Sequence, residues 1–307
     1  MISYGLENIK HLLVSTLQNS LDKVNSDNLK KIYEIRIKAS RPTTVTAEGK
    51  TYFLCNTGLT QNPSLAIKVS QNDIDSFLYS FCQGSVYSYE NTIKEGFVSR
   101  FGVRVGISGD LCTDNTQVKG FSRIDGLNIR FGNHISGASD KIMQYLSSNG
   151  FPNGKGILVL SKPGNGKTTL LRDLAVNLSS PCTIQKNTKI FRVCVIDQRE
   201  EIKIGQVFEN SCADFLCCAD KEFCINLATR VLTPEIIICD EIGTCKEAEQ
   251  ILASVFSGVI FIASAHAQSI KEAQDKKHIK LLILKTMLIV LVLFVLHLRM
   301  EALVLLN

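Results

Sequence analysis

Tryptophan is absent from this 307-residue chain, and aromatic residues make up only 7% of it. Proteins that bind single-stranded nucleic acid stack the bases on aromatic side chains within a basic groove, and no interleaving of aromatic with basic residues occurs here. The formal net charge of +5 is mild, so it does not argue for a nucleic-acid partner. A charge of this size permits contact with an acidic partner or a membrane surface.

The usual cysteine patterns of metal sites are missing as well, although the chain has eleven cysteines. It has no C-x-x-C pair and no histidine at zinc spacing, which argues against a metal site built on cysteines. Cys194 and Cys239 lie inside apolar runs. The chain does not start with a secretory signal, so we expect reduced, mostly buried thiols and a cytoplasmic location, with peripheral membrane contact as a further expectation.

The length suggests about two domains, and 45% hydrophobic residues are enough to bury real cores. Residues 1–150 predict a smaller mixed α+β domain without a catalytic constellation. Its expected elements are a helix over 1–20, a half-buried strand over 32–37, a hairpin over 44–54, a helix from Asp73 to about Tyr87, and short strands at 96–100, 103–107 and 127–130. A Gly/Pro/Asn cluster at 149–154 predicts the boundary to the next domain.

Residues 151–277 alternate between strand and helix patterns. The strand candidates are 156–160, 192–196, 235–239 and 258–263. This alternation predicts an α/β domain with a parallel sheet covered by helices, whose ligand binds at the carboxyl ends of the strands.

A phosphate-binding loop motif follows the first of these strands and precedes an amphipathic helix pattern over 170–175. It consists of Ser161, Lys162, Pro163, Gly164, Asn165, Gly166, Lys167, Thr168 and Thr169. Its glycines let backbone N–H groups turn toward a phosphate, and the start of the next helix adds partial positive charge. Lys167 is expected to reach the β- and γ-phosphates of ATP, and the Thr168 hydroxyl to bind Mg²⁺. The first position is Ser161 where the pattern has glycine, a small residue that can still make the turn. The sequence therefore predicts a P-loop NTPase domain.

A second motif lies about 70 residues further on, where the apolar run 236–239 ends in Asp240 and Glu241. Together with the P-loop it reads as a Walker B pattern. Asp240 is expected to hold the Mg²⁺ shell. Glu241 is expected to orient and deprotonate the attacking water, because phosphoryl transfer depends mostly on positioning and charge stabilisation.

Two further strands end in polar segments that belong at the same edge of the sheet. The segment 197–201 contains Arg199, and 264–266 ends in His266. Each segment either senses the γ-phosphate and positions the water, or is simply a solvated strand end. Arg199 and Arg230 are candidates for a guanidinium that reaches a phosphate, within the chain or across a subunit boundary, and an ordinary surface position is the alternative for both.

The composition changes abruptly after residue 277, and Met287 through Leu296 contains no polar residue. Three interpretations of the hydrophobic tail 278–307 stay open at this point: buried strands that complete the sheet, a segment that touches or spans a membrane, or a disrupted reading frame.

Taken together, these segments resemble the stage III sporulation protein AA family of endospore-forming bacteria, in order over roughly residues 30–268. The matching segments are Glu34-Ile35-Arg36-Ile37 with Arg41-Pro42, Gly96-Phe97 with Arg104-Val105-Gly106, Leu127-Asn128-Ile129-Arg130, Ser136-Gly137-Ala138-Ser139 before Asp140-Lys141, the P-loop with Leu170-Leu171-Arg172-Asp173, Asp197-x-Arg199-x-Glu201-Ile202, Pro234-Glu235 through Asp240-Glu241-Ile242-Gly243, and Ala263-x-Ala265-His266. Ser161, Gln198 and the tail depart from the family pattern.

The resemblance implies an AAA-type ATPase related to the hexameric ATPases of secretion systems. It implies a homo-oligomeric ring that serves membrane-associated channel proteins between mother cell and forespore. The sequence does not give the size of the ring, for which a hexamer is one candidate. Two alternatives remain: a nucleotide-gated assembly factor with negligible hydrolysis, against which Glu241 argues, and an ATPase acting on single-stranded nucleic acid, against which the absence of tryptophan argues.

Overall fold

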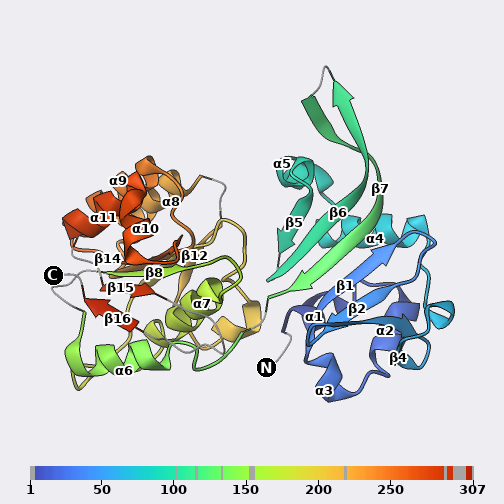
Figure 1. Cartoon of the computed structure of the whole chain (residues 1–307), viewed down its shortest axis with the longest axis horizontal. Helices are drawn as coiled ribbons and strands as arrows, with labels where there is room; N and C mark the ends of the chain where they lie inside the picture. Colours follow the sequence, from blue (N-terminus) through green and yellow to red (C-terminus); the bar gives the residue numbers. More distant parts are fainter. Residues whose placement is uncertain are drawn as a thin grey trace. The chain divides into compact units, whose positions relative to one another are not determined.

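The computed structural model describes residues 4–100, 102–114, 117–132, 134–151, 156–217, 220–286, 289–292 and 302–305. These residues form two compact units that divide between His134 and Ile135 (Figure 1). The boundary expected near residue 150 lies beyond this division. The reason is α6 (Asp140–Asn149), whose Ile142 and Leu146 are buried in the core of the second unit.

The first unit contains a seven-stranded antiparallel sheet in the order β4-β3-β2-β1-β7-β6-β5. Its strands are β1 (Ile32–Lys38), β2 (Thr44–Ala47), β3 (Lys50–Cys55), β4 (Gly58–Thr60), β5 (Phe97–Arg100), β6 (Val103–Asp114) and β7 (Gln117–Phe131), and its α-helices are α1 (Tyr4–Lys10), α2 (Ser15–Leu21), α3 (Ser26–Leu29), α4 (Gln71–Phe81) and α5 (Glu90–Lys94), with short 3₁₀ turns at Pro63–Leu65 and Val86–Tyr89.

Two helix predictions for this unit need correction. The helix expected over 1–20 is broken into α1 and α2. The helix expected from Asp73 starts earlier, because Ser70 is its N-cap and forms a capping box with Asp73. It ends at Phe81, since Gln83 and Gly84 both take positive φ angles, of 53° and 76°.

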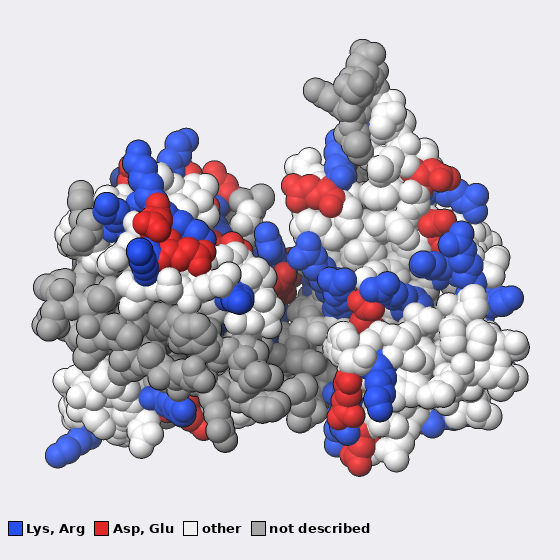
Figure 2. Space-filling view, viewed as in Figure 1, with Lys and Arg blue, Asp and Glu red and all other residues white. Residues whose placement is uncertain are grey.

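The two faces of this sheet differ in character. One face packs against helices in a core that includes Ile35 of β1 and Phe77 of α4. The other face is polar, and Figure 2 shows lysine and arginine side chains gathered over β1 and β7. Here the Glu34 carboxylate accepts hydrogen bonds from Arg36 Nε at 2.7 Å and Arg130 Nε at 3.1 Å. Burial alone raises the pKa of Glu34, but these two guanidinium groups lower it overall.

The second unit contains another seven-stranded sheet, in the order β12-β11-β13-β14-β8-β15-β16. All neighbouring pairs are parallel except β15 with β16. The strands are β8 (Ile157–Ser161), β11 (Val193–Ile196), β12 (Asp214–Leu216), β13 (Ile236–Cys239), β14 (Ile260–His266), β15 (Ile289–Val292) and β16 (Ala302–Leu305), and a small hairpin joins β9 (Cys182–Ile184) to β10 (Asn187–Lys189). The four strand candidates of the sequence correspond to β8, β11, β13 and β14, and the predicted parallel sheet is present.

Helices cover both faces of this sheet (Figure 1). Besides α6 they are α7 (Lys167–Leu178), α8 (Lys221–Leu227), α9 (Cys245–Phe256), α10 (Ile270–Asp275) and α11 (Lys277–Thr286), with a 3₁₀ turn at Gly205–Phe208 and a π-helical turn at Ala228–Leu232. Because side chains alternate along a strand, each strand feeds two cores. In β8, for example, Leu158 and Leu160 join a core with α8, α9 and α11, whereas Ile157 and Val159 join a core with α6 and α7.

The tail, for which the sequence allows three interpretations, contributes β15 and β16 to this sheet. Residues 289–292 of β15 pair in register with Ile157–Leu160 of the P-loop strand β8. The structure thus has the sheet-completing arrangement for these two segments, while residues 287–288 and 293–296 of the apolar run lie outside the described ones. Within the described part of the chain, no helix is both long and apolar enough to cross a bilayer.

Candidate active site

The P-loop connects the carboxyl end of β8 to the first turn of α7. Gly164 and Gly166 adopt the left-handed φ angles of 76° and 80°, and Gly166 is the N-cap of α7. A residue with a Cβ is strained in this region. Ser161, in contrast, is the last residue of β8 and has no positive φ. Glycine is therefore not required at Ser161, and its departure from the motif does not disturb the loop.

Lys167 lies inside the loop, with only 7% of the residue exposed. Its Nζ donates hydrogen bonds to the backbone oxygens of Ser161 at 3.3 Å and Lys162 at 3.1 Å. It also lies 2.8 Å from Nδ1 of His266. Burial lowers the pKa of Lys167, and the nearby carboxylates of Glu241 and Asp240 act in the opposite direction. The ammonium is thus held against the backbone of the loop and beside His266.

His266 connects Lys167 to the proposed catalytic carboxylate. Its Nε2 lies 3.0 Å from Oε1 of Glu241. Because an ammonium group can only donate, Nδ1 of His266 accepts from Lys167, and this assigns the ring proton to Nε2 when the ring is neutral. His266 ends β14, the strand between β8 and β13, and pairs in register with Ser161. The strand order therefore places Lys167, His266 and Glu241 in one line across the edge of the sheet.

Asp240 and Glu241 follow β13 directly, as the Walker B pattern predicts. Asp240 Oδ1 accepts a hydrogen bond from the Ser264 hydroxyl at 3.3 Å. The next residues are held through their backbone: the N–H of Ile242 donates to the Ser264 carbonyl at 2.9 Å, and the N–H of Gly243 donates to Glu247 at 2.8 Å. These backbone hydrogen bonds fix the turn that carries both acids.

The segment after β11 has a structural role that the sequence did not reveal. Asp197 is fully buried, and its carboxylate accepts three backbone N–H bonds, from Glu201 at 2.9 Å and from Ile202 and Lys203 at 2.8 Å each. Burial raises the pKa of Asp197, and the three N–H donors counteract that rise. Asp197 is neither a solvated strand end nor exposed toward a phosphate, because it holds a loop closed.

Arg172 of α7 supports the same loop from the other side. It is 2% exposed, and its guanidinium donates to the carbonyls of Ile202 at 3.0 Å and of Glu201. Burial lowers its pKa to about 10. Almost all of the helix from Leu170 to Ala175 is buried, so the amphipathic pattern expected after the P-loop is wrong. The helix instead carries a buried cation that ties the P-loop element to the loop after Asp197.

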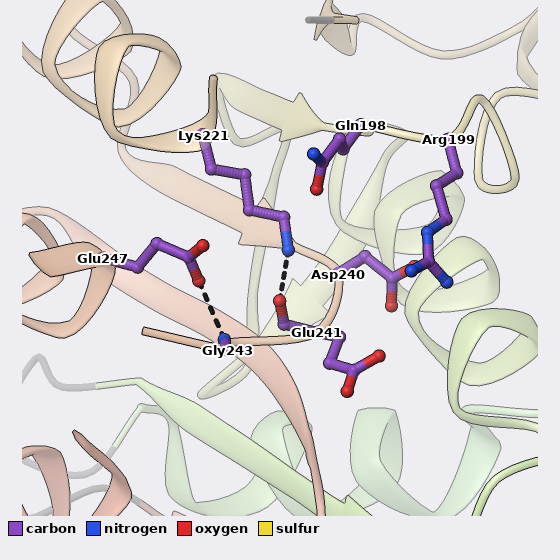
Figure 3. A pocket seen from close by; sticks show the side chains of 7 residues that line it. All are labelled: Gln198, Arg199, Lys221, Asp240, Glu241, Gly243 and Glu247. Carbon is purple, nitrogen blue, oxygen red and sulfur yellow. Dashed lines mark hydrogen bonds between the residues drawn. The ribbon is translucent and has the colours of Figure 1, made fainter. Parts of the chain in front are cut away.

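Arg199 projects from this loop into a pocket of about 210 Å³ (Figure 3). The pocket is lined by Gln198, Arg199, Lys221, Asp240, Glu241, Gly243 and Glu247. Sequence reasoning found Arg199, Asp240 and Glu241, but it missed Lys221 and Glu247. One feature could have drawn attention to Lys221: it begins a helix, where the helix dipole disfavours a cation.

Arg230 lies elsewhere in this unit. It is exposed on the π-helical turn that precedes β13, and it does not line the pocket. The adjacent Thr229 hydroxyl lies 2.7 Å from that of Ser254, near the end of α9 and just before β14 begins. Arg230 is therefore at the amino edge of the sheet, whereas the P-loop is at the carboxyl edge. A role across a subunit boundary stays a prediction.

The residues expected to bind Mg²⁺ offer suitable oxygen ligands. Thr168 is the second residue of α7, next to Lys167, and Asp240 follows β13 at the same edge of the sheet. Hydroxyl and carboxylate oxygens match the preference of Mg²⁺, which usually keeps several waters and binds through one or two protein ligands plus substrate phosphates. In the described ranges no group of three or more His, Cys, Asp or Glu residues is arranged to hold a metal ion.

Comparison with known proteins identifies the family of this chain. The family model described as "Sporulation stage III, protein AA" matches residues 5–299. The chain belongs to this family. It is also 31% identical to the stage III sporulation protein AA of Bacillus subtilis (strain 168) over 281 residues, which are 90% of this chain and 86% of that protein. The resemblance seen in the sequence is thereby confirmed.

Solved structures show the same fold at much lower identity. The pilus retraction motor PilT with bound ADP matches with a TM-score of 0.55 and 14% identity, over 87% of this chain and 75% of that chain. The ATPase DotB of Legionella pneumophila matches with a TM-score of 0.50 and 15% identity over 82% of this chain. The match spans 65% of the DotB chain, slightly less than two thirds. The predicted α/β P-loop architecture therefore agrees with the fold of known ATPases.

Proposed function

We propose that this sporulation stage III protein AA family member is a Mg²⁺-dependent ATPase. The observation that carries the proposal is the line from Lys167 through His266 to Glu241 at the carboxyl edge of the sheet. It connects a cation on the phosphate-binding loop to the carboxylate that we propose as the general base. Mg²⁺, when bound through Thr168 and Asp240, supplies charge neutralisation at the phosphates.

Lys167 is the residue that first meets the nucleotide in this mechanism. It now donates to two backbone oxygens and one histidine nitrogen, all of them uncharged acceptors. A phosphate oxygen is a charged acceptor and forms a stronger hydrogen bond with an ammonium group. We expect Lys167 to exchange these partners for the β- and γ-phosphates, while the backbone N–H groups of the loop bind the remaining oxygens.

Glu241 is the proposed general base. It is half-buried, and its Oε1 accepts a hydrogen bond from His266. In the reaction Glu241 orients a water molecule and takes its proton as the water oxygen attacks the γ-phosphorus. The bond between that phosphorus and the β,γ-bridging oxygen breaks, so ADP leaves with the bonding electron pair. His266 stands between Lys167 and Glu241, so a change in the partners of Lys167 alters what holds Glu241. Phosphate binding and water activation are coupled in this arrangement.

The cellular role we propose follows from the family and the fold. The energy of ATP hydrolysis would drive assembly or operation of a secretion-like channel complex between mother cell and forespore. The chain would act as a homo-oligomeric ring on the cytoplasmic side, next to membrane-associated sporulation proteins. The family match and the likeness to DotB and PilT support this role. Light scattering of the purified chain with and without ATP tests the ring.

The decisive test of the activity is steady-state ATP hydrolysis by the wild type and by Glu241→Gln, with ATP binding measured in parallel. Loss of a general base lowers turnover by about 10²- to 10⁴-fold, and ATP affinity should be retained. Glu249→Gln, an exposed glutamate of α9, is the matched control and should hydrolyse ATP like the wild type. Equal turnover in wild type and Glu241→Gln would refute the role of Glu241. ATP binding without wild-type turnover would refute the ATPase and favour a nucleotide-gated assembly factor.

A further inference from the structure

Lys221 is a buried cation in an unfavourable place. It is the first residue of α8 and only 8% exposed. Its positive charge is repelled by the partial positive charge at the N-terminus of the helix. The preceding Asp220 caps this helix by accepting a hydrogen bond from the N–H of Phe223. Burying an ammonium group is also costly unless it is well hydrogen-bonded. A lysine in this position therefore calls for a specific partner.

That partner is the backbone carbonyl of Glu241, to which Lys221 Nζ donates a hydrogen bond (Figure 3). Across the part of the chain that the structure describes, no carboxylate forms an ion pair with Lys221, although Asp240, Glu241 and Glu247 line the same pocket. A lysine that only balanced these charges would point to a carboxylate. Lys221 points instead to the main chain of the proposed catalytic residue.

This contact completes the support of a single peptide group. The carbonyl of Glu241 and the N–H of Ile242 belong to the same planar peptide and point in opposite directions. The N–H donates to the Ser264 carbonyl of β14 at 2.9 Å, and the carbonyl accepts from Lys221 of α8. The peptide plane is thus held from both sides. Its orientation sets the direction in which the Glu241 side chain leaves the backbone.

We propose that Lys221 is a positioning residue that orients Glu241 for water activation. The inference rests on the proposed ATPase function and adds a residue to it. Without the ammonium, the peptide keeps only the bond to Ser264 and can rotate about it. A misplacement of a catalytic group by about 1 Å can lower turnover by about 10²-fold. The P-loop lies on the other side of β14 from this contact, so nucleotide binding should not change.

The test compares Lys221→Met, Lys221→Arg and the exposed-lysine control Lys280→Met with the wild type. Lys221→Met keeps the length of the side chain and removes the donor, whereas Lys221→Arg keeps both charge and donors. Steady-state hydrolysis at saturating ATP reports kcat, and calorimetric titration with ATPγS reports the Kd. We expect kcat to fall by about 10- to 100-fold in Lys221→Met with an unchanged Kd, and to recover largely in Lys221→Arg. Lys280→Met should match the wild type.

Several outcomes would overturn this inference. An unchanged kcat in Lys221→Met beside an active wild type refutes it while leaving the ATPase intact. Equal losses of kcat and of ATPγS affinity show a general structural defect and refute it as well. If Lys221→Met does not fold, Lys221→Leu, which also lacks a donor, takes its place under the same two criteria. A wild type that binds ATPγS without hydrolysing ATP refutes the ATPase proposal and this inference together.

Discussion

Replacing Asp197 by asparagine tests how the loop beside the candidate site is held. The carboxylate has two oxygens, of which Oδ1 accepts from Glu201 and Oδ2 accepts from Ile202 and Lys203. An asparagine has one oxygen and one NH₂ group. With its oxygen in the place of Oδ2, its NH₂ group faces the N–H of Glu201, so one hydrogen bond is lost and two donors meet.

The size of the effect follows from these contacts. A hydrogen bond to a charged acceptor contributes about 1.5–3 kcal/mol, and the two remaining bonds weaken because their acceptor becomes neutral. Burial of the charged carboxylate is costly and raises the pKa of Asp197. The neutral asparagine avoids this cost, which offsets part of the loss. We expect a net destabilisation of the loop by about 2 kcal/mol, which makes its opening about 30-fold more frequent.

Hydrogen exchange followed by mass spectrometry measures this opening directly. Peptides that cover 198–204 should exchange about 30-fold faster in Asp197→Asn than in the wild type. The exposed Asp275 of α10 provides the control, since Asp275→Asn should leave the same peptides unchanged. Exchange in Asp197→Asn within about two-fold of the wild type would show that this carboxylate does not hold the loop. In that case the three hydrogen bonds of Asp197 would not account for the position of Arg199.

Three further predictions concern the P-loop, the first unit and Arg230. Gly166→Ala strains a left-handed residue by about 1–2 kcal/mol and should weaken ATP binding about 10-fold in calorimetry. Ser161→Gly should change the ATP affinity less than about two-fold. Equal losses of ATP affinity in the two variants would contradict the loop geometry. Because the pKa of Glu34 is lowered from 4.5 on folding, its stabilisation is complete above that pH and is lost as the pH falls through the folded-state value. The melting temperatures of wild type and Glu34→Gln should therefore differ at pH 7 and converge in acid, and a constant gap would count against this linkage. If Arg230 acts across a subunit boundary, an equimolar mixture of Arg230→Gln and Glu241→Gln chains should regain part of the hydrolysis that each lacks alone, and no recovery would exclude that role.

The features that the sequence predicted well are those that depend on short segments. The P-loop and the Asp240-Glu241 pair each lie within a few residues of a strong apolar strand, so their position at the sheet edge followed from the pattern alone. His266 was also predicted to lie there, because it ends another such strand. What the pattern did not show was the order of the strands, which makes His266 the direct neighbour of both Lys167 and Glu241.

The features that the sequence did not predict depend on contacts between distant segments. The segment that begins at Asp197 was expected either to face the γ-phosphate or to end in solvent, but Asp197 is buried because the chain folds back over it. Arg172 occupied a place where a helix surface was expected, and it is buried because α7 is covered by the loop that Arg172 binds. Lys221 meets Glu241 across 20 residues of sequence. No periodicity within one segment reports such contacts.

The strand order also determines which substitutions should lower the rate of ATP hydrolysis without changing nucleotide affinity. Glu241 has two kinds of support: on the side of β14 it contacts His266, which also contacts Lys167, and on the side of α8 its carbonyl contacts Lys221. A change on the first side disturbs the group that meets the phosphate together with the group that acts on water. A change on the second side reaches only Glu241. Substitutions at Lys221 should therefore lower hydrolysis alone, whereas those at Lys167 should lower nucleotide affinity and hydrolysis together.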